Sequence, residues 1–154
     1  MVRFHSTLSD RSVYFRYFQM LNYKDRVSHE RLTRICFIDY SREMALVAVD
    51  QGNGKGEGEI VGVGRLTRPM GGRIPEFALL VSDTHQRFGV GRLLLDGLLN
   101  FARREAIPEI TGQILPDNAA MLGLAKKLGF NLQYSVEERA VIATLTTGIA
   151  PSAP

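Results

Sequence analysis

The chain has 154 residues, of which 45% are hydrophobic and 23% charged, a balance that is ordinary for a globular protein. Its formal net charge of +3 comes without a basic run, so the composition does not favour a nucleic-acid-binding protein. One cysteine excludes an internal disulfide, and no apolar run approaches the ~18 residues of a membrane span, so we expect a single domain in the reducing cytoplasm.

The first third of the chain predicts a short strand and two helices. The strand covers residues 2–5, one helix follows Ser9 as its N-cap, and another begins near Ser28. Cys36 stands in an apolar stretch and is interpreted as a small buried residue. In the first helix we expect these side chains to be buried: Val13, Phe15, Tyr17, Phe18 and Leu21.

Residues 44–68 predict a β-hairpin around a glycine-rich turn. The turn contains GNGKG (52–56), which is superficially similar to a phosphate-binding loop. Its lysine is followed by Gly56 instead of Ser or Thr, and it joins two strands, so a turn is favoured. Gly62 and Gly64, inside the second strand, indicate a bulge or the close approach of another segment.

The second half of the chain alternates strands and helices. Residues 76–81 and 110–115 predict a parallel pair of strands connected by a long amphipathic helix that opens with GVGR. A helix begins at Asp117 or Asn118, and two final strands follow it. The order predicts an α/β (α+β) fold: a mixed, mostly antiparallel sheet of six to seven strands, flanked by about four helices.

The stretch QRFGVGR (86–92) lies between strand 76–81 and the long helix. Amides at the start of a helix lack acceptors within it and lie at the positive end of its dipole. Gly89 and Gly91 permit close approach of a ligand, and Arg87 and Arg92 add positive charge, so the stretch predicts a diphosphate site. Leu94 replaces the third glycine of a dinucleotide fingerprint, which argues against a Rossmann domain. Glycines that only tighten the turn remain the alternative.

Two stretches of the sequence resemble the GNAT family of N-acetyltransferases. The cofactor motif Q/R-x-x-G-x-G/A is matched by Gln86, Gly89 and Gly91, and a second signature by Asn118 and Leu128-Gly129-Phe130. The resemblance covers residues 1–146, which we expect to form one domain, with a flexible tail at 147–154. The first third further resembles the acetyltransferase module of bacterial protein lysine acetyltransferases that act on acyl-CoA synthetases.

The resemblance implies acetyl-CoA as the cosubstrate and no metal. Strand 76–81 would splay from its neighbour and pair with the pantetheine arm, with the Leu79 amide beside the thioester oxygen. Asn118 would hold the arm from the other side, and Met121 would add an apolar contact. The expected cofactor-binding residues are Leu79, Val81, Gln86, Arg87, Phe88, Gly89, Val90, Gly91, Arg92, Asn118 and Met121.

Glu76 is the expected general base. A lysine ammonium, with a pKa of about 10.4, must lose a proton before it can attack a thioester. Glu76 opens the strand that would carry the thioester, and it matches a Glu of the protein acetyltransferase subgroup; the alternative is a solvated carboxylate at a strand end. Many family members place a tyrosine acid at the position of Ala125, so we expect water or another residue to protonate the leaving thiolate.

The acceptor is expected to be a protein lysine, with acetyl transferred directly to it. Tyr40 and Glu43 would contact the acceptor, and Asp39, Glu57 and Glu59 would extend an acidic rim. A small-molecule amine and a non-catalytic acyl-CoA-binding sensor are the alternatives. We expect a monomer or homodimer without nucleic-acid or membrane partners. The three histidines show no metal-ligand spacing.

Overall fold

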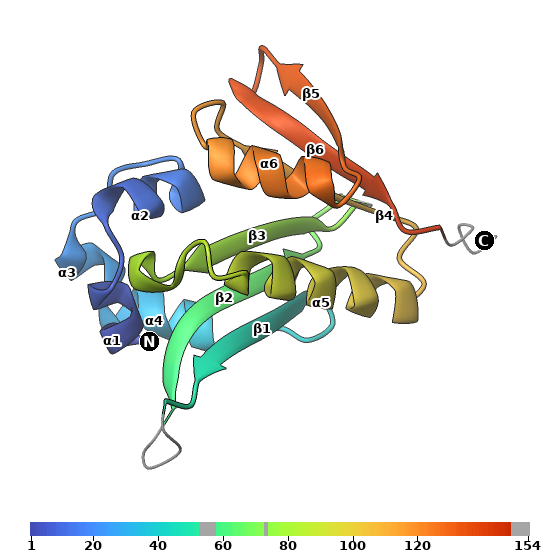
Figure 1. Cartoon of the computed structure of the whole chain (residues 1–154). Helices are drawn as coiled ribbons and strands as arrows, with labels where there is room; N and C mark the ends of the chain where they lie inside the picture. The colour runs from blue at the N-terminus through green and yellow to red at the C-terminus, as the bar shows by residue number, and fades with distance from the viewer. Residues whose placement is uncertain (53–57, 73, 149–154) are drawn as a thin grey trace.

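The computed structural model describes residues 1–52, 58–72 and 74–148. Its centre is a six-stranded sheet in the order β1-β2-β3-β4-β6-β5, in which β3 and β4 are parallel and the other neighbours antiparallel (Figure 1). The predicted fold class is confirmed. The strands are β1 Glu43–Asp50, β2 Glu59–Thr67, β3 Glu76–Val81, β4 Glu109–Ile114, β5 Asn131–Ser135 and β6 Ala140–Thr146.

Helices cover both faces of this sheet. Leu95 and Leu98 of α5 pack with Ala125 of α6 in one hydrophobic cluster, while Phe4 and Val13 form a second cluster on the opposite face. Side chains that alternate along β2 and β3 supply both clusters, as the period of a strand requires. The helices are α1 Val2–Ser6, α2 Asp10–Tyr17, α3 Tyr23–Arg26, α4 His29–Cys36, the single 3₁₀ turn η1 Asp83–His85, α5 Val90–Arg104 and α6 Ala119–Lys127.

Helix α5 lies unusually close to β2 because the strand carries glycines at the contact. A Cβ atom on Gly62 would stand 2.9 Å from a methyl of Val90, and one on Gly64 would stand 3.3 Å from Leu94. The expected close approach is therefore confirmed. A bulge lies beside Gly62 as well: Ala48 of β1 pairs with Gly62 and Val49 with Ile60, so Val61 is the extra residue of β2.

Strands β3 and β4 meet at one end and then separate. Glu76 and Thr111 are their paired residues, and the Thr111 amide donates to the Pro75 carbonyl at 2.9 Å. The Phe77 ring lies so close to Gly112 that a Cβ there would approach it to 2.5 Å. In Figure 1, β5 and β6 lean away from β1–β3. Beyond Phe77, the backbone groups on this edge of β3 are therefore not paired with β4.

The N-terminal third departs most from the sequence prediction. Residues 2–5, predicted as a strand, belong to helix α1, and packing of Phe4 against β2 and β3 overrides the strand-like pattern. Helix α2 ends at Tyr17, and Phe18, expected to be buried, is 38% exposed in the left-handed conformation. The short helix α3 was not predicted. Cys36 is exposed, contrary to expectation.

The hairpin prediction is confirmed by the antiparallel pairing of β1 with β2, although most of the turn, residues 53–57, lies outside the described part of the chain. Near the last described residue, the buried Thr147 donates its hydroxyl to the Ile107 carbonyl at 2.6 Å.

The described helices include none that is both long and apolar enough to cross a membrane.

Candidate functional site

The start of helix α5 presents free backbone amides. The first helical hydrogen bond joins the Leu93 amide to the Gly89 carbonyl at 2.9 Å, so the amides of residues 90–92 precede it and have no acceptor within the helix. Gly89 adopts φ 87°, a left-handed conformation that turns the chain into the helix. Arg87, also left-handed, and Phe88 are exposed beside these amides. The arrangement can bind a phosphate group.

The side chain of Gln86 is engaged within the protein. Its Nε2 lies 3.0 Å from Ser12 Oγ, 3.2 Å from Asp83 Oδ1 and 3.3 Å from the Val81 carbonyl. These contacts join β3, η1 and α2. The side chain of Gln86 therefore fixes the position of the loop that carries residues 87–92.

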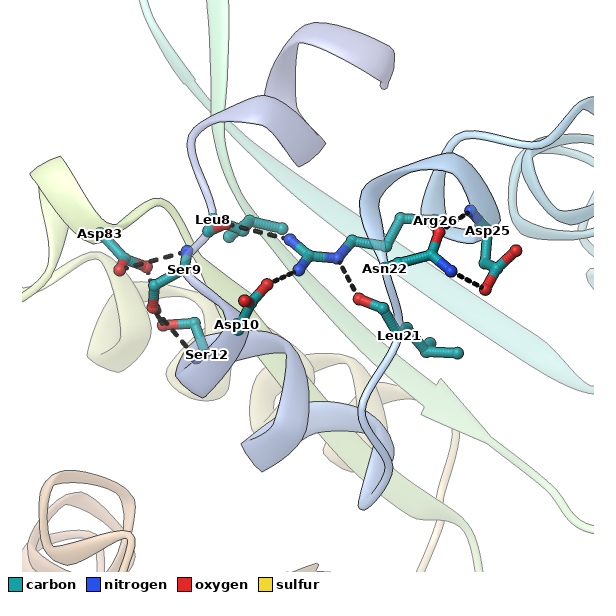
Figure 2. A network of polar contacts seen from close by, with 9 residues as sticks. All are labelled: Leu8, Ser9, Asp10, Ser12, Leu21, Asn22, Asp25, Arg26 and Asp83. Atoms are coloured by element: carbon teal, nitrogen blue, oxygen red, sulfur yellow. Dashed lines mark hydrogen bonds and ion pairs between the residues drawn. The ribbon is translucent and has the colours of Figure 1, made fainter.

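A polar network ties that loop to the N-terminal helices (Figure 2). The Ser9 amide and the Ser12 hydroxyl both donate to the Asp83 carboxylate, at 3.3 and 2.7 Å. Further along, the buried guanidinium of Arg26 donates to the Leu8 carbonyl at 3.1 Å and also pairs with Asp10. The network holds α2 and α3 in a fixed relation to the end of β3.

The free edge of β3 offers hydrogen-bonding groups at alternate residues. The Ser82 amide, just past the end of β3, donates to the Val61 carbonyl of β2. The alternate residues of β3 before it, Glu76, Ala78 and Leu80, therefore direct their backbone groups toward β2. Phe77, Leu79 and Val81 therefore direct their amides and carbonyls toward the gap before β4. The Val81 carbonyl is used by Gln86, whereas the amides of Leu79 and Val81 face the gap.

The opposite side of the gap is formed by the start of α6. Asn118 caps this helix, its Oδ1 accepting from the Met121 amide at 3.2 Å. Its Nδ2 donates no hydrogen bond to any other residue that the structure describes. Met121 packs against the main hydrophobic cluster, and Ala125 is fully buried within that cluster. No hydroxyl acid therefore stands at position 125.

Glu76 lies at the closed end of the gap, where β3 still pairs with its neighbours. It is half-buried and stands directly opposite Thr67 of β2 and Thr111 of β4. Burial raises the pKa of the Glu76 carboxyl; the positive charge of Arg16 opposes this shift and the negative charge of Glu138 adds to it. A carboxylate with a raised pKa is suited to accept a proton.

A cavity of about 220 Å³ lies on the same face of the sheet as Glu76. Thr67, paired with Glu76, and Ala78, two residues further along β3, both line it. The predicted substrate residue Glu43 lines it too, but its carboxylate lies 3.4 Å from the guanidinium of Arg65. The other predicted residue, Tyr40, lines a second cavity and is 81% exposed.

The structure separates the described members of the expected acidic rim. Glu59 pairs with Asp50 at the far end of the hairpin from Glu43, and the Asp39 carboxylate accepts hydrogen bonds from Ser41. Glu57 lies outside the described residues. The cavity is lined instead by three arginines, Arg16, Arg34 and Arg65.

Sequence reasoning missed Arg16, Arg65 and His5. Arg16 follows the buried Val13 by three residues, so a helical projection places it on the inward face of α2. Arg65 alternates with buried residues of β2 on the face opposite Leu66. Nothing in the sequence marks His5, because the strand-like pattern of residues 2–5 does not show the helix that buries it. Within the described ranges, no group of three or more His, Cys, Asp or Glu side chains could hold a metal ion.

Comparison with known proteins gives one family. The model of the acetyltransferase (GNAT) family matches residues 11–130 of this chain. That range begins in α2 and ends just after α6, so it includes Glu76, the α5 start and Asn118.

Solved structures show the same architecture. The GNAT domain of S. lividans PAT is 27% identical, with a TM-score of 0.80 over 94% of this chain and 82% of that one. YncA from Salmonella typhimurium, solved with acetyl-CoA, is 21% identical, with a TM-score of 0.62 over 99% of this chain and 88% of that one. The PaiA N-acetyltransferase of Thermoplasma acidophilum, solved with coenzyme A, is 14% identical, with a TM-score of 0.64 over 94% of each chain.

Proposed function

Because this chain belongs to the acetyltransferase (GNAT) family and uses acetyl-CoA as its cosubstrate, we propose that it transfers the acetyl group directly to a protein lysine, with Glu76 as the general base. The observation that carries this proposal is the position of Glu76. It is half-buried, its pKa is raised, and it stands where the free edge of β3 begins.

The free edge of β3 and the α5 start would bind the cosubstrate. The amides of residues 90–92 are suited to the diphosphate, with Gly89 and Gly91 allowing its approach and Arg87 and Arg92 adding charge. The amides of Leu79 and Val81 are suited to the pantetheine arm and the thioester oxygen, and Asn118 Nδ2 lies across the gap. Stabilisation of a developing oxyanion by such an amide is worth about 10²–10³ in rate.

The transfer needs no nucleophile from the enzyme. Glu76 takes one proton from the acceptor ammonium, the freed amine nitrogen bonds to the thioester carbonyl carbon, and the carbon–sulfur bond breaks. The second proton, which the nitrogen loses as the amide forms, passes through water to the leaving thiolate. The leaving thiolate, with a thiol pKa of about 8.5, would take a proton from water, since position 125 holds alanine. Atoms and charges balance without a further reagent.

Exposed apolar side chains near Glu76 support a protein acceptor. Phe37 and Tyr40 are each 81% exposed before β1, and Met70 is 86% exposed before β3. The Arg68 amide donates to the Arg42 carbonyl at 2.8 Å, so the two connections that carry these side chains lie together. Apolar groups exposed together are typical of surfaces that contact another protein. Resemblance to protein lysine acetyltransferases favours an acyl-CoA synthetase as that protein.

A small-molecule amine is the second candidate acceptor. The cavity beside Glu76 supports this candidate, because a polar recess of this size can hold a small ligand. It can equally hold a lysine side chain. Incubation with labelled acetyl-CoA, a purified acyl-CoA synthetase and a panel of small amines separates the candidates. Label in the synthetase supports the protein acceptor, and label confined to the amines contradicts it.

Residues 1–146 are proposed as the catalytic unit, and the cytoplasm as its location. The single, exposed Cys36 is compatible with a reducing compartment.

The Glu76→Gln variant tests the base. We expect kcat to fall by about 10²–10⁴, the range for loss of a general base, while the Kd for acetyl-CoA is unchanged. Wild-type kcat/KM should rise with pH along an acid limb centred above the ordinary pKa of a Glu, and the variant should lack that limb. Unfolding measurements at pH 7 should find the variant at least as stable, since burial disfavours the charged form of Glu76.

Glu138→Gln is the matched control. It makes the same chemical change at an exposed site, removes a negative charge that raises the pKa of Glu76, and should move the acid limb to lower pH with kcat retained. Glu76→Gln with wild-type turnover would exclude Glu76 as the base.

A further inference from the structure

The cavity beside Glu76 is more positive than an amine-binding site requires. Arg16, Arg34 and Arg65 contribute guanidinium groups to its wall, and Glu43 is the single carboxylate among its lining residues. Glu43 pairs with Arg65, and Arg34 pairs with Glu30 at 3.0 Å. Arg16 takes part in none of the ion pairs found among the described residues.

A second unpaired arginine lies next to Arg16. The guanidinium carbons of Arg16 and Arg31 stand 4.9 and 4.4 Å from the centre of the Tyr17 ring. Nε of Arg31 is buried without a hydrogen-bond partner among the described residues. Burial lowers the pKa of Arg16, and the charges of Arg65 and Arg31 lower it further, opposed by Tyr17 and Glu76. Positive charge is therefore concentrated here, and among the described residues neither Arg16 nor Arg31 forms an ion pair.

The wall also contains an unsatisfied polar side chain. His5 lines the cavity at 1% exposure, and neither ring nitrogen has a hydrogen-bond partner among the described residues. Buried polar groups without partners are uncommon in folded proteins, and they mark places where water or a ligand completes the structure. The volume of about 220 Å³ holds several water molecules, at ~30 Å³ each, or one small polar group.

The cavity and the proposed base are near enough to act on one molecule. Glu76 is paired with Thr67, which lines the cavity, and the charge of Arg16 acts on the carboxyl of Glu76. A guanidinium is the side chain best matched to a carboxylate, because it can donate two parallel hydrogen bonds. An acceptor with its amine at Glu76 can thus extend a carboxylate toward Arg16.

We propose that this cavity binds a carboxylate that the acceptor carries close to its reacting amine. The inference rests on the proposed transfer at Glu76. The carboxylate belongs to a free amino acid or to an acidic side chain beside a protein lysine; the chemistry at Arg16 is the same. A positive cavity beside the base also selects against polyamines, whose second charge would be repelled.

Matched acceptors test the proposal. Acetyl transfer by the full chain is measured with leucine against leucinamide, with lysine against cadaverine, and with lysine peptides flanked by Glu against Gln. Wild type should favour the carboxylate member of at least one pair by roughly 10- to 100-fold in kcat/KM, the value of a charged hydrogen bond. Arg16→Gln should abolish this preference mainly through KM, at a pH above the acid limb, whereas Arg103→Gln, exposed on α5, should keep it.

Direct binding separates this proposal from the proposed function. Calorimetric titration with leucine and with glutarate, in the presence of coenzyme A, should show heat that Arg16→Gln removes. Transfer to amines without a carboxylate preference, and with no Arg16-dependent heat, overturns the carboxylate site and leaves the acetyltransferase intact. Arg16-dependent heat without transfer to any acceptor overturns the proposed function and supports the site. Preference in the peptide pair alone identifies a protein acceptor.

Discussion

Single residues at this site are buried at a cost to the free energy of folding, and for Glu76 we propose a chemical use. Glu76 is held half-buried, where its charged form is disfavoured, and His5 is buried with no hydrogen-bond partner among the described residues. Sequence patterns suggested Glu76 as the base because it opens the strand expected to carry the thioester and matches a Glu of the resembled subgroup. They did not identify Arg16 or His5, because the cavity is made by residues that meet only after α1 and α2 pack on the sheet.

The protonation of His5 should make stability depend on pH. Burial, together with the positive charges of Arg31 and Arg26, lowers the pKa of His5 from 6.5 to about 4. Between these values the unfolded chain binds a proton that the folded chain does not, so stability should fall as pH decreases from about 6.5 to about 4. The full shift corresponds to about 3 kcal/mol, at 1.36 kcal/mol per pKa unit.

Denaturant unfolding of wild type and His5→Phe between pH 4 and 7 measures this effect. The variant removes two unsatisfied nitrogens, so it should be at least as stable as wild type near pH 5 and should have a flatter pH profile. Parallel profiles for the two proteins would show that His5 does not titrate abnormally.

Among the elements, strand β2 and helix α5 approach each other closely near the site. The sequence identified both, and it predicted a close approach at Gly62 and Gly64 from glycines inside a strand. It could not identify the partner, because the approach of Val90 and Leu94 is a tertiary contact. The early end of α2 was also missed: a left-handed Phe18 stops it, and no glycine signals that stop.

Gly62→Ala should disturb the start of α5. Its new methyl would lie 2.9 Å from Val90 and 3.0 Å from Leu94, which are side-chain atoms at the first turn of the helix. We expect a loss of about 1–3 kcal/mol in the free energy of unfolding, as for an overpacked core, and a higher Kd for acetyl-CoA. Thermal unfolding and calorimetry measure the two effects.

Gly123→Ala serves as the comparison for this change. It adds the same methyl group within helix α6, where nothing lies within 4 Å, so it should stabilise the protein by about 0.4–1 kcal/mol and leave the Kd unchanged. Equal effects of the two substitutions would contradict the proposed contact between β2 and α5.

In the whole molecule, the two faces of the sheet have different roles. Helices α5 and α6 flank the gap proposed for acetyl-CoA, and α1, α2 and α4 contribute to the cavity proposed for the acceptor. The Asp83 contacts shown in Figure 2 connect the two sides. Regular spacing made the second half predictable almost residue by residue, from strand 76–81 to strand 140–146. The N-terminal helices are short, and their form depends on packing that no local pattern records.

The central claim is that the free amides at the start of α5 bind the diphosphate of coenzyme A. Amide ¹H–¹⁵N spectra recorded during titration with coenzyme A test it most directly, with pantetheine as a ligand that lacks the diphosphate. We predict the largest shifts at residues 89–92 with coenzyme A only, and shifts at Leu79 and Val81 with both ligands. Binding of coenzyme A that leaves residues 89–92 unshifted, or no binding at all, would contradict the account.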